Sequence, residues 1–378
     1  MEVIKNEKLF RLERLVAEAI GEVLRPSSSS GIASSLAVLR PLSFFVAWNG
    51  VLCLVFDGFP PLLAALKDRL NSFVAADGSS DGGGAETSGG AGPESSPQLP
   101  RENFGSKWPK VTLGAMSDGA SALSLEELSD LRKLCRLHGE RLAAAADIKA
   151  NAAAAEENED EGRYDEEERT SAAPTTVVPV RVGVESLTVV AYAARGLEDD
   201  SHDHNNRDGK GRLSLTHLPL LPPVSGSTRS GATGSAALPP SPEETARARG
   251  VVSEWDNLEE YMPRVAAAGN RISSYREQSP SGSTLVTFLF RGRDDEAAEA
   301  EAETETVDSS SSGGGSSSSS SSTTSIPPPP PPPQVRLKVA IAEFRAAVDA
   351  RFPGRWEWLA DGSLHCTIRA LGSEALTA

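Results

Sequence analysis

Four side chains in this sequence stand in a pattern that suits chemistry on the surface of a sheet. His365 and Thr367 flank one residue in one stretch, and Lys110 and Thr112 flank one residue in another. Both stretches read as β-strands, in which alternate side chains share a face. Histidine exchanges protons near neutral pH, whereas lysine is normally protonated there. One face of each strand is therefore predicted to be core, and the other is a candidate site.

The surrounding periodicity predicts the elements that hold these two strands. Helical spacing of apolar residues covers 2–25, 61–73, 255–265 and 335–351, and a capping box at 124–127 begins one more helix. Strand patterns cover 44–56, 108–116, 177–194, 284–290, 356–359 and 364–371. Hairpin turns are expected at 49–50 and at 361–362. This order lacks regular βαβ alternation and predicts an α+β fold with antiparallel sheets.

Long parts of the chain have no periodic hydrophobicity. They are the Gly/Ser/Ala/Pro-rich, acidic or serine-rich stretches 74–100, 143–172, 198–212, 223–250 and 293–333. Such stretches bury too little apolar surface to offset the entropy of ordering them. About 220 residues remain for folding, which is the size of one ordinary domain or two small lobes.

The net charge of -16 is concentrated in two of these stretches. Residues 155–169 hold nine acids and two arginines, and residues 293–308 hold eight acids and one arginine, so each carries -7. The foldable remainder is near neutral. The overall charge therefore does not exclude an anionic ligand in a local cleft.

The three cysteines have no metal-type spacing and stand in apolar contexts, which indicates buried free thiols in a reducing compartment. The start of the chain is charged and helical, without the pattern of a secretory signal. The most apolar run, 44–56, is too short to span a bilayer. We therefore expect a soluble cytoplasmic or nuclear protein without a membrane segment.

With these elements in order, the chain resembles the two-histidine phosphoesterase superfamily, which includes the LigT-type 2′-5′ RNA ligases and cyclic nucleotide phosphodiesterases. The resemblance lies in the His-x-Thr-hydrophobic strand at His365 and its degenerate twin at Lys110, each after an amphipathic helix. It implies a bilobal fold with two antiparallel sheets and outer helices around a central cleft. Lys110 departs from the family pattern, in which a histidine holds that position.

The resemblance also implies roles for these residues. His365 is expected to be the surviving catalytic acid or base, with Lys110 as its partner or as added positive charge. Thr112 and Thr367 are expected to bind phosphate oxygens, helped by Arg369, which lies two residues beyond Thr367 and is expected to share its face; an exposed strand arginine is the alternative. The ligand is then a 2′,3′-cyclic phosphate or an RNA-end phosphate, and no cofactor or metal is expected.

Two alternatives remain open at this stage. Loss of one of two acid-base groups typically lowers the rate by about 10²- to 10⁴-fold. The first alternative to an enzyme is therefore a catalytically impaired module that binds a nucleotide or RNA. A linker-rich interaction protein with a vestigial cleft is the other. For that reading, the run 327–333 of seven prolines is a candidate ligand for a proline-binding domain, with a spacer as its default role.

The expected organisation is a helix and linker over 1–35 and one phosphoesterase-like domain over 36–378, expected to be a monomer. Its first lobe covers about 36–197 and its second about 250–378, with insertions at 74–100, 143–172, 198–250 and 293–333. Three further features of the sequence are expected to be structural rather than functional. His138 is expected to pack in a helix, Tyr275 and Arg276 to lie in a surface loop rather than stack on a base, and the acidic and histidine residues of 199–208 to hold no metal.

Overall fold

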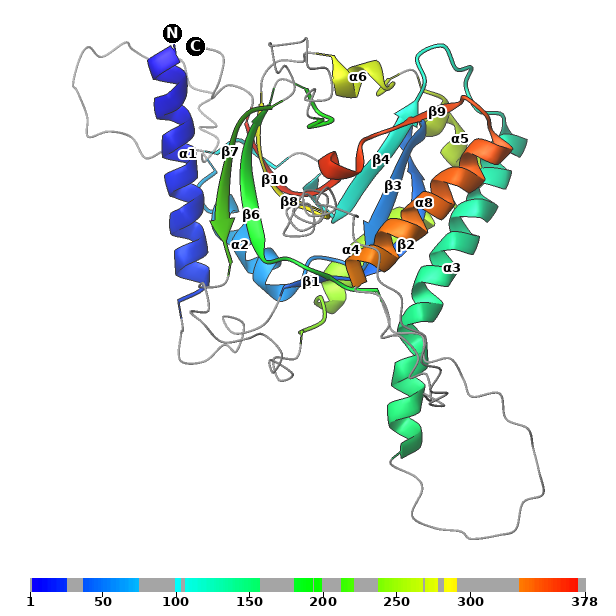
Figure 1. Ribbon diagram of the computed structural model, residues 1–378, viewed down its shortest axis with the longest axis horizontal. Helices are drawn as coiled ribbons and strands as arrows, with labels where there is room; N and C mark the ends of the chain where they lie inside the picture. The colour runs from blue at the N-terminus through cyan, green and yellow to red at the C-terminus, as the bar shows by residue number, and fades with distance from the viewer. Residues whose placement is uncertain are drawn as a thin grey trace, which may run out of the picture.

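The computed structural model describes residues 2–25, 37–74, 99–102, 106–156, 180–192, 194–198, 212–220, 237–267, 269–277, 282–290 and 333–372. These residues form a mixed α+β fold with antiparallel sheets, as the sequence predicted (Figure 1). The strands, in chain order, are β1 (Val38–Leu39), β2 (Pro41–Ala47), β3 (Val51–Phe56), β4 (Lys110–Met116), β5 (Val182–Gly183), β6 (Ser186–Tyr192), β7 (Arg212–Pro219), β8 (Gly282–Phe288), β9 (Trp356–Trp358) and β10 (His365–Gly372). The helices are α1 (Glu2–Val23), α2 (Pro61–Asn71), α3 (Leu125–Glu156), α4 (Pro242–Ser253), α5 (Leu258–Ala266), α6 (Ser273–Arg276) and α8 (Pro333–Arg351).

One large sheet has the strand order β2-β3-β4-β10-β8-β6-β7, and β9 also pairs with β4. The two motif strands, β4 and β10, are therefore direct neighbours at its centre. We expected them in two neighbouring sheets; they share one sheet instead, because β4 and β10 hydrogen-bond to each other in antiparallel register. A separate two-stranded sheet joins β1 to β5.

The two halves of the large sheet contain the same kinds of element in the same chain order. One side contains β2, β3, α2 and β4 in chain order, and the other contains β6, β8, α8 and β10. Because Val111 on β4 pairs with Cys366 on β10, a local two-fold axis through this pair relates Lys110 to His365 and Thr112 to Thr367. Lys110 and His365 therefore occupy equivalent positions about this axis, as do Thr112 and Thr367.

Each motif-preceding helix packs against strands of the other half. Phe344 of α8 stacks on Phe44 of β2 with ring centroids 4.1 Å apart, and Arg369 of β10 donates a hydrogen bond to Asn71 of α2. In Figure 1, α8 and α3 lie together beside β2, β3 and β4, whereas α2 and α1 lie towards the opposite end of the sheet. This exchange ties the two halves into one hydrophobic core.

Helix α1 is part of that core. Its apolar stripe is buried, including Leu12, Val16 and Ala19, and it contacts α2. Glu13 also accepts a hydrogen bond from Thr216 of β7. A boundary at residue 35 therefore does not separate α1 from the fold, because this stripe covers apolar surface that would otherwise face water.

Local signals explain several elements. Asn49 and Gly50 both have positive φ, 63° and 75°, and close the β2–β3 hairpin as predicted. The Ser124 hydroxyl accepts from the Glu127 amide and the Glu127 carboxylate accepts from the Ser124 amide, which confirms the capping box at the start of α3.

Three expectations about the elements were wrong. No hairpin joins β9 and β10: the 3-10 turn at Asp361–Ser363 redirects the chain so that both strands pair with the same side of β4. Helix α3 continues to Glu156, into the stretch 143–172, and the stretch 198–250 contains β7 and the start of α4. Pairing with β6 supplies the stability that the β7 sequence alone lacks.

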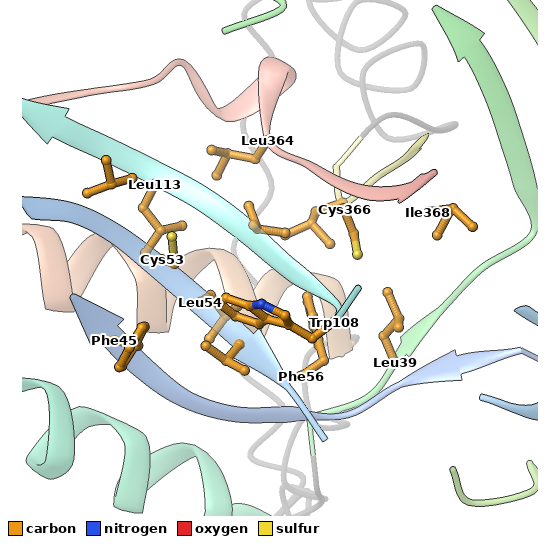
Figure 2. Packing of buried hydrophobic residues seen from close by; sticks show 14 of the residues in the cluster. Leu39, Phe45, Cys53, Leu54, Phe56, Trp108, Leu113, Leu364, Cys366 and Ile368 are labelled. Carbon is orange, nitrogen blue, oxygen red and sulfur yellow. The ribbon is translucent and has the colours of Figure 1, made fainter. Parts of the chain in front are cut away.

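The three cysteines are buried and free, as predicted. Figure 2 shows Cys53 of β3 and Cys366 of β10 on either side of β4, among the leucines of the core. Among the helices that the structure describes, none combines the length and apolar character that crossing a membrane needs.

Candidate functional site

The β4–β10 register brings the four motif side chains together. Because Cys366 pairs with Val111, His365 lies beside Thr112 and Thr367 lies beside Lys110. Directly opposed residues of an antiparallel pair share a face, so all four side chains stand on one face of the sheet. Lys110 and His365 occupy diagonal positions, and diagonal neighbours in an antiparallel pair are typically about 7–8 Å apart.

The orientation of His365 is set by a backbone acceptor. Its Nδ1 atom lies 2.7 Å from the Ser363 carbonyl oxygen. A carbonyl can only accept, so Nδ1 carries the proton, and in the neutral ring the lone pair is on Nε2. Phe288 of β8 meets the imidazole edge-on, with ring centroids 6.0 Å apart. The half-buried His365 therefore presents Nε2 as its acid-base atom.

Lys110 is a half-buried cation with little to neutralise it. Its Nζ atom lies 4.1 Å from the centroid of the Trp108 ring, a cation–π contact. Within the described residues it has no ion pair or hydrogen bond of its own. Burial lowers the pKa of the Lys110 ammonium below its ordinary value. Lys110 is thus a stronger acid than a surface lysine and is available to an anion.

Thr112 links this face to a buried thiol and a partly buried phenol. Cys53 pairs with Thr112 across β3 and β4, and burial raises the pKa of its thiol. Burial also raises the pKa of the Tyr275 phenol, an effect that interaction with Thr112 partly opposes. Both groups therefore stay protonated and neutral at physiological pH, and neither supplies a negative charge to pair with Lys110.

A pocket of about 240 Å³ opens beside Lys110 and Thr112. Its walls come from the β2–β3 hairpin, the start of β4, α4 and the segment at Asn270. They are mainly apolar, with Phe45, Trp48 and Trp108 contributing aromatic surface. The larger hollow of about 1000 Å³ between α3 and α5 is lined by Asp130, Lys133 and Asp256 and lies away from the motif strands. The smaller pocket is therefore the one that adjoins the candidate site.

Arg369 lies on the opposite face from Thr367. A register shift separates them, since Thr367 pairs with Val286 and Arg369 with the adjacent Leu285, and adjacent residues of a strand face opposite ways. Arg369 is fully buried and donates to Asn71, to the Pro100 carbonyl and to the Ala370 carbonyl. The bulge that moves it could not be read from the alternation, and Arg369 is placed as a structural connector rather than as a phosphate ligand.

The other residues considered from the sequence either have structural contacts or lie outside the described part of the chain. His138 is buried and meets Phe44 and Phe344 edge-on, as expected for a packed helix residue. Arg276 forms ion pairs with Glu198 at 3.0 Å and Glu357 at 2.5 Å. No group of metal-ligating side chains occurs in the part of the chain that the structure describes. The stretch 199–208 and prolines 327–332 lie outside the described residues.

Sequence reasoning did not single out Trp108 or Ser363 for a role at this face, and it expected Tyr275 in a surface loop, whereas the structure places it half-buried in α6. The available signal for Trp108 was its position two residues before Lys110, which a strand places on the same side. Ser363 and Tyr275 carried no such signal, because they reach the site from a turn and from a short helix.

Comparison with known proteins adds no relative. No family model, no curated protein and no solved structure matches this chain. The geometry of β4, β10 and the adjoining pocket therefore carries what can be inferred about function.

Proposed function

We propose that this protein resembles the two-histidine phosphoesterases in function as well as in pattern, and binds a 2′,3′-cyclic phosphate or an RNA-end phosphate on the β4–β10 face. The observation that carries the proposal is the register of Val111 with Cys366, which gathers Lys110, Thr112, His365 and Thr367 on one face around a local two-fold axis. In this proposal the two halves of the sheet act as the two lobes of a cleft.

The chemistry follows from the four groups. The Thr112 and Thr367 hydroxyls donate to phosphate oxygens, and Lys110 offsets their negative charge. Opening a cyclic phosphate requires a base that takes a proton from the attacking water and an acid that gives one to the departing ribose oxygen. Nε2 of His365 is the base, and the Lys110 ammonium, acidified by burial, is the acid.

An impaired binding module on the same fold is the second candidate function. The observation that favours it is Lys110 itself, because an ammonium cannot accept a proton and so supplies only one direction of proton transfer. The interaction-protein alternative draws no support from the described residues, since prolines 327–332 lie outside them.

Turnover of 2′,3′-cyclic nucleotides and of RNA with a cyclic-phosphate end, by purified protein with His365→Ala as control, separates these functions. Turnover that depends on His365 supports the enzyme. Binding of both ligands without turnover supports the module. Absence of binding as well as turnover would overturn the assignment of this face.

A further inference from the structure

We infer that the pocket beside Lys110 is a subsite for the nucleobase of the ligand, with a preference for a single ring that presents hydrogen-bond acceptors. This inference rests on the proposed function and deepens it, because it names the part of the ligand that lies next to the phosphate.

The pocket lies next to the four motif side chains. The pocket is lined by Lys110 and Thr112, whose neighbours on β10 are Thr367 and His365. A phosphate held on the four motif side chains therefore lies at the mouth of the pocket. The group attached to the same ribose then points either into the pocket or away from the protein.

The volume and the lining of the pocket also favour a nucleobase. The pocket volume of about 240 Å³ is below the roughly 300–1,000 Å³ of sites for drug-sized ligands. It therefore suits a fragment rather than a whole dinucleotide. Of the three aromatic residues in the lining, Trp48 is 43% exposed, whereas Phe45 and Trp108 are buried. Trp48 is therefore the ring on which a base can stack, and such stacking is typically worth about 1–3 kcal/mol.

Two hydrogen-bond donors in the lining of the pocket have no partner among the described residues. The Trp108 side chain is 3% exposed, and its Nε1–H has no hydrogen-bond partner within the described residues. Lys110 likewise has no polar partner there. Among the acceptors of the pocket, one Glu254 oxygen pairs with Arg264 at 2.8 Å, and the Asn270 amide oxygen accepts from Arg195 at 3.1 Å. A ligand that pairs with these two donors must carry hydrogen-bond acceptors, such as the ring carbonyl oxygens of uracil.

The test compares two stable ligands that share one phosphate. Uridine 2′-monophosphate carries the base, and methyl ribofuranoside 2-phosphate lacks it. We expect the uridine ligand to bind at least tenfold more tightly by calorimetry. Ala47→Leu fills the pocket from β2 without changing the motif strands, and it should remove this difference while leaving the affinity for the base-free ligand unchanged.

Two further variants sharpen the result. Trp108→Phe keeps an aromatic ring but removes the pyrrole part of the indole together with its N–H, so it should weaken the uridine ligand by about 3- to 10-fold. Ala64→Leu, a half-buried alanine of α2 at a different hollow, is the matched control and should change neither affinity. Thermal unfolding of each variant establishes that it is folded.

Failure of this inference is distinguishable from failure of the proposed function. If both ligands bind equally and Ala47→Leu changes neither, the base does not occupy the pocket, although the phosphate site stands. If neither ligand binds, the phosphate site is wrong and the subsite inference is overturned with it.

Discussion

The Nδ1 atom of His365 donates its proton to the carbonyl oxygen of Ser363 across 2.7 Å. The 3-10 turn immediately before β10 thereby fixes which nitrogen of the neutral ring carries the proton. Ser363 is itself buried, and its hydroxyl donates to the Ala360 carbonyl, so the acceptor is held in a rigid turn. In the neutral ring this contact leaves the lone pair on Nε2, which is the atom that can act as a base.

Lys110→His should create the second acid-base group. The local two-fold axis relates position 110 to position 365, so the new imidazole would stand where the family pattern has its first histidine. Hydrolysis of a 2′,3′-cyclic nucleotide should then rise by about 10²- to 10⁴-fold, as measured by product formation under first-order conditions. The gain should vanish in the Lys110→His, His365→Ala double variant. An unchanged rate in the single variant would argue against the shared site.

Lys110→Met should stabilise the fold and weaken phosphate binding together. Burial lowers the folded-state pKa of Lys110, so the unfolded chain binds more protons between that pKa and its ordinary value of 10.5. The charge therefore destabilises the fold at neutral pH, and the penalty is relieved as pH rises through this window. In the variant, the free energy of unfolding in urea should be higher at pH 7, and its rise towards pH 10 should be smaller.

Lys67→Met provides the contrasting control for that experiment. Lys67 is also buried with a lowered pKa, but its Nζ lies 2.6 Å from the Glu102 carboxylate. Removing this partner leaves the largely buried Glu102 carboxylate without its counter-charge, with only the Ser106 hydroxyl, among the described residues, still donating to it, so the variant should be less stable than the wild type. If both methionine variants shift stability in the same direction, the lack of a partner at Lys110 is not the cause.

Arg369→Met should lower stability without changing phosphate affinity. The side chain satisfies Asn71 and the carbonyls of Pro100 and Ala370, which become unpaired when the guanidinium is removed. The expected loss is about 2–4 kcal/mol in the free energy of unfolding. Calorimetry with a nucleoside 2′-monophosphate, at a temperature where the variant is folded, checks the second half. A large loss of affinity there would return Arg369 to the phosphate site.

His138 should make stability fall in mild acid. Burial chiefly, with a contribution from Arg141, lowers its pKa below the ordinary 6.5, so the unfolded chain takes up a proton at a higher pH than the folded one. Stability from this group is complete above about pH 6.5 and is lost as pH falls towards the folded-state pKa. His138→Leu should reduce the difference in unfolding free energy between pH 7.5 and pH 5. An identical difference in both proteins would show that other groups cause the acid sensitivity.

The sequence alone determined the elements whose signals are local. The turn at Asn49 and Gly50, the capping box at Ser124 and the alternation around His365 and Lys110 each depend on neighbouring residues, so each could be predicted. The α+β class followed from their order.

Tertiary structure alone decided how distant segments meet. Only the pairing of Val111 with Cys366 shows that the two motifs share a face. Only the register shift against β8 turns Arg369 into the core, and only the turn at Ser363 selects Nε2 of His365. These outcomes depend on strand register and on contacts between residues far apart in the chain, and the alternation of a single strand carries no information about either.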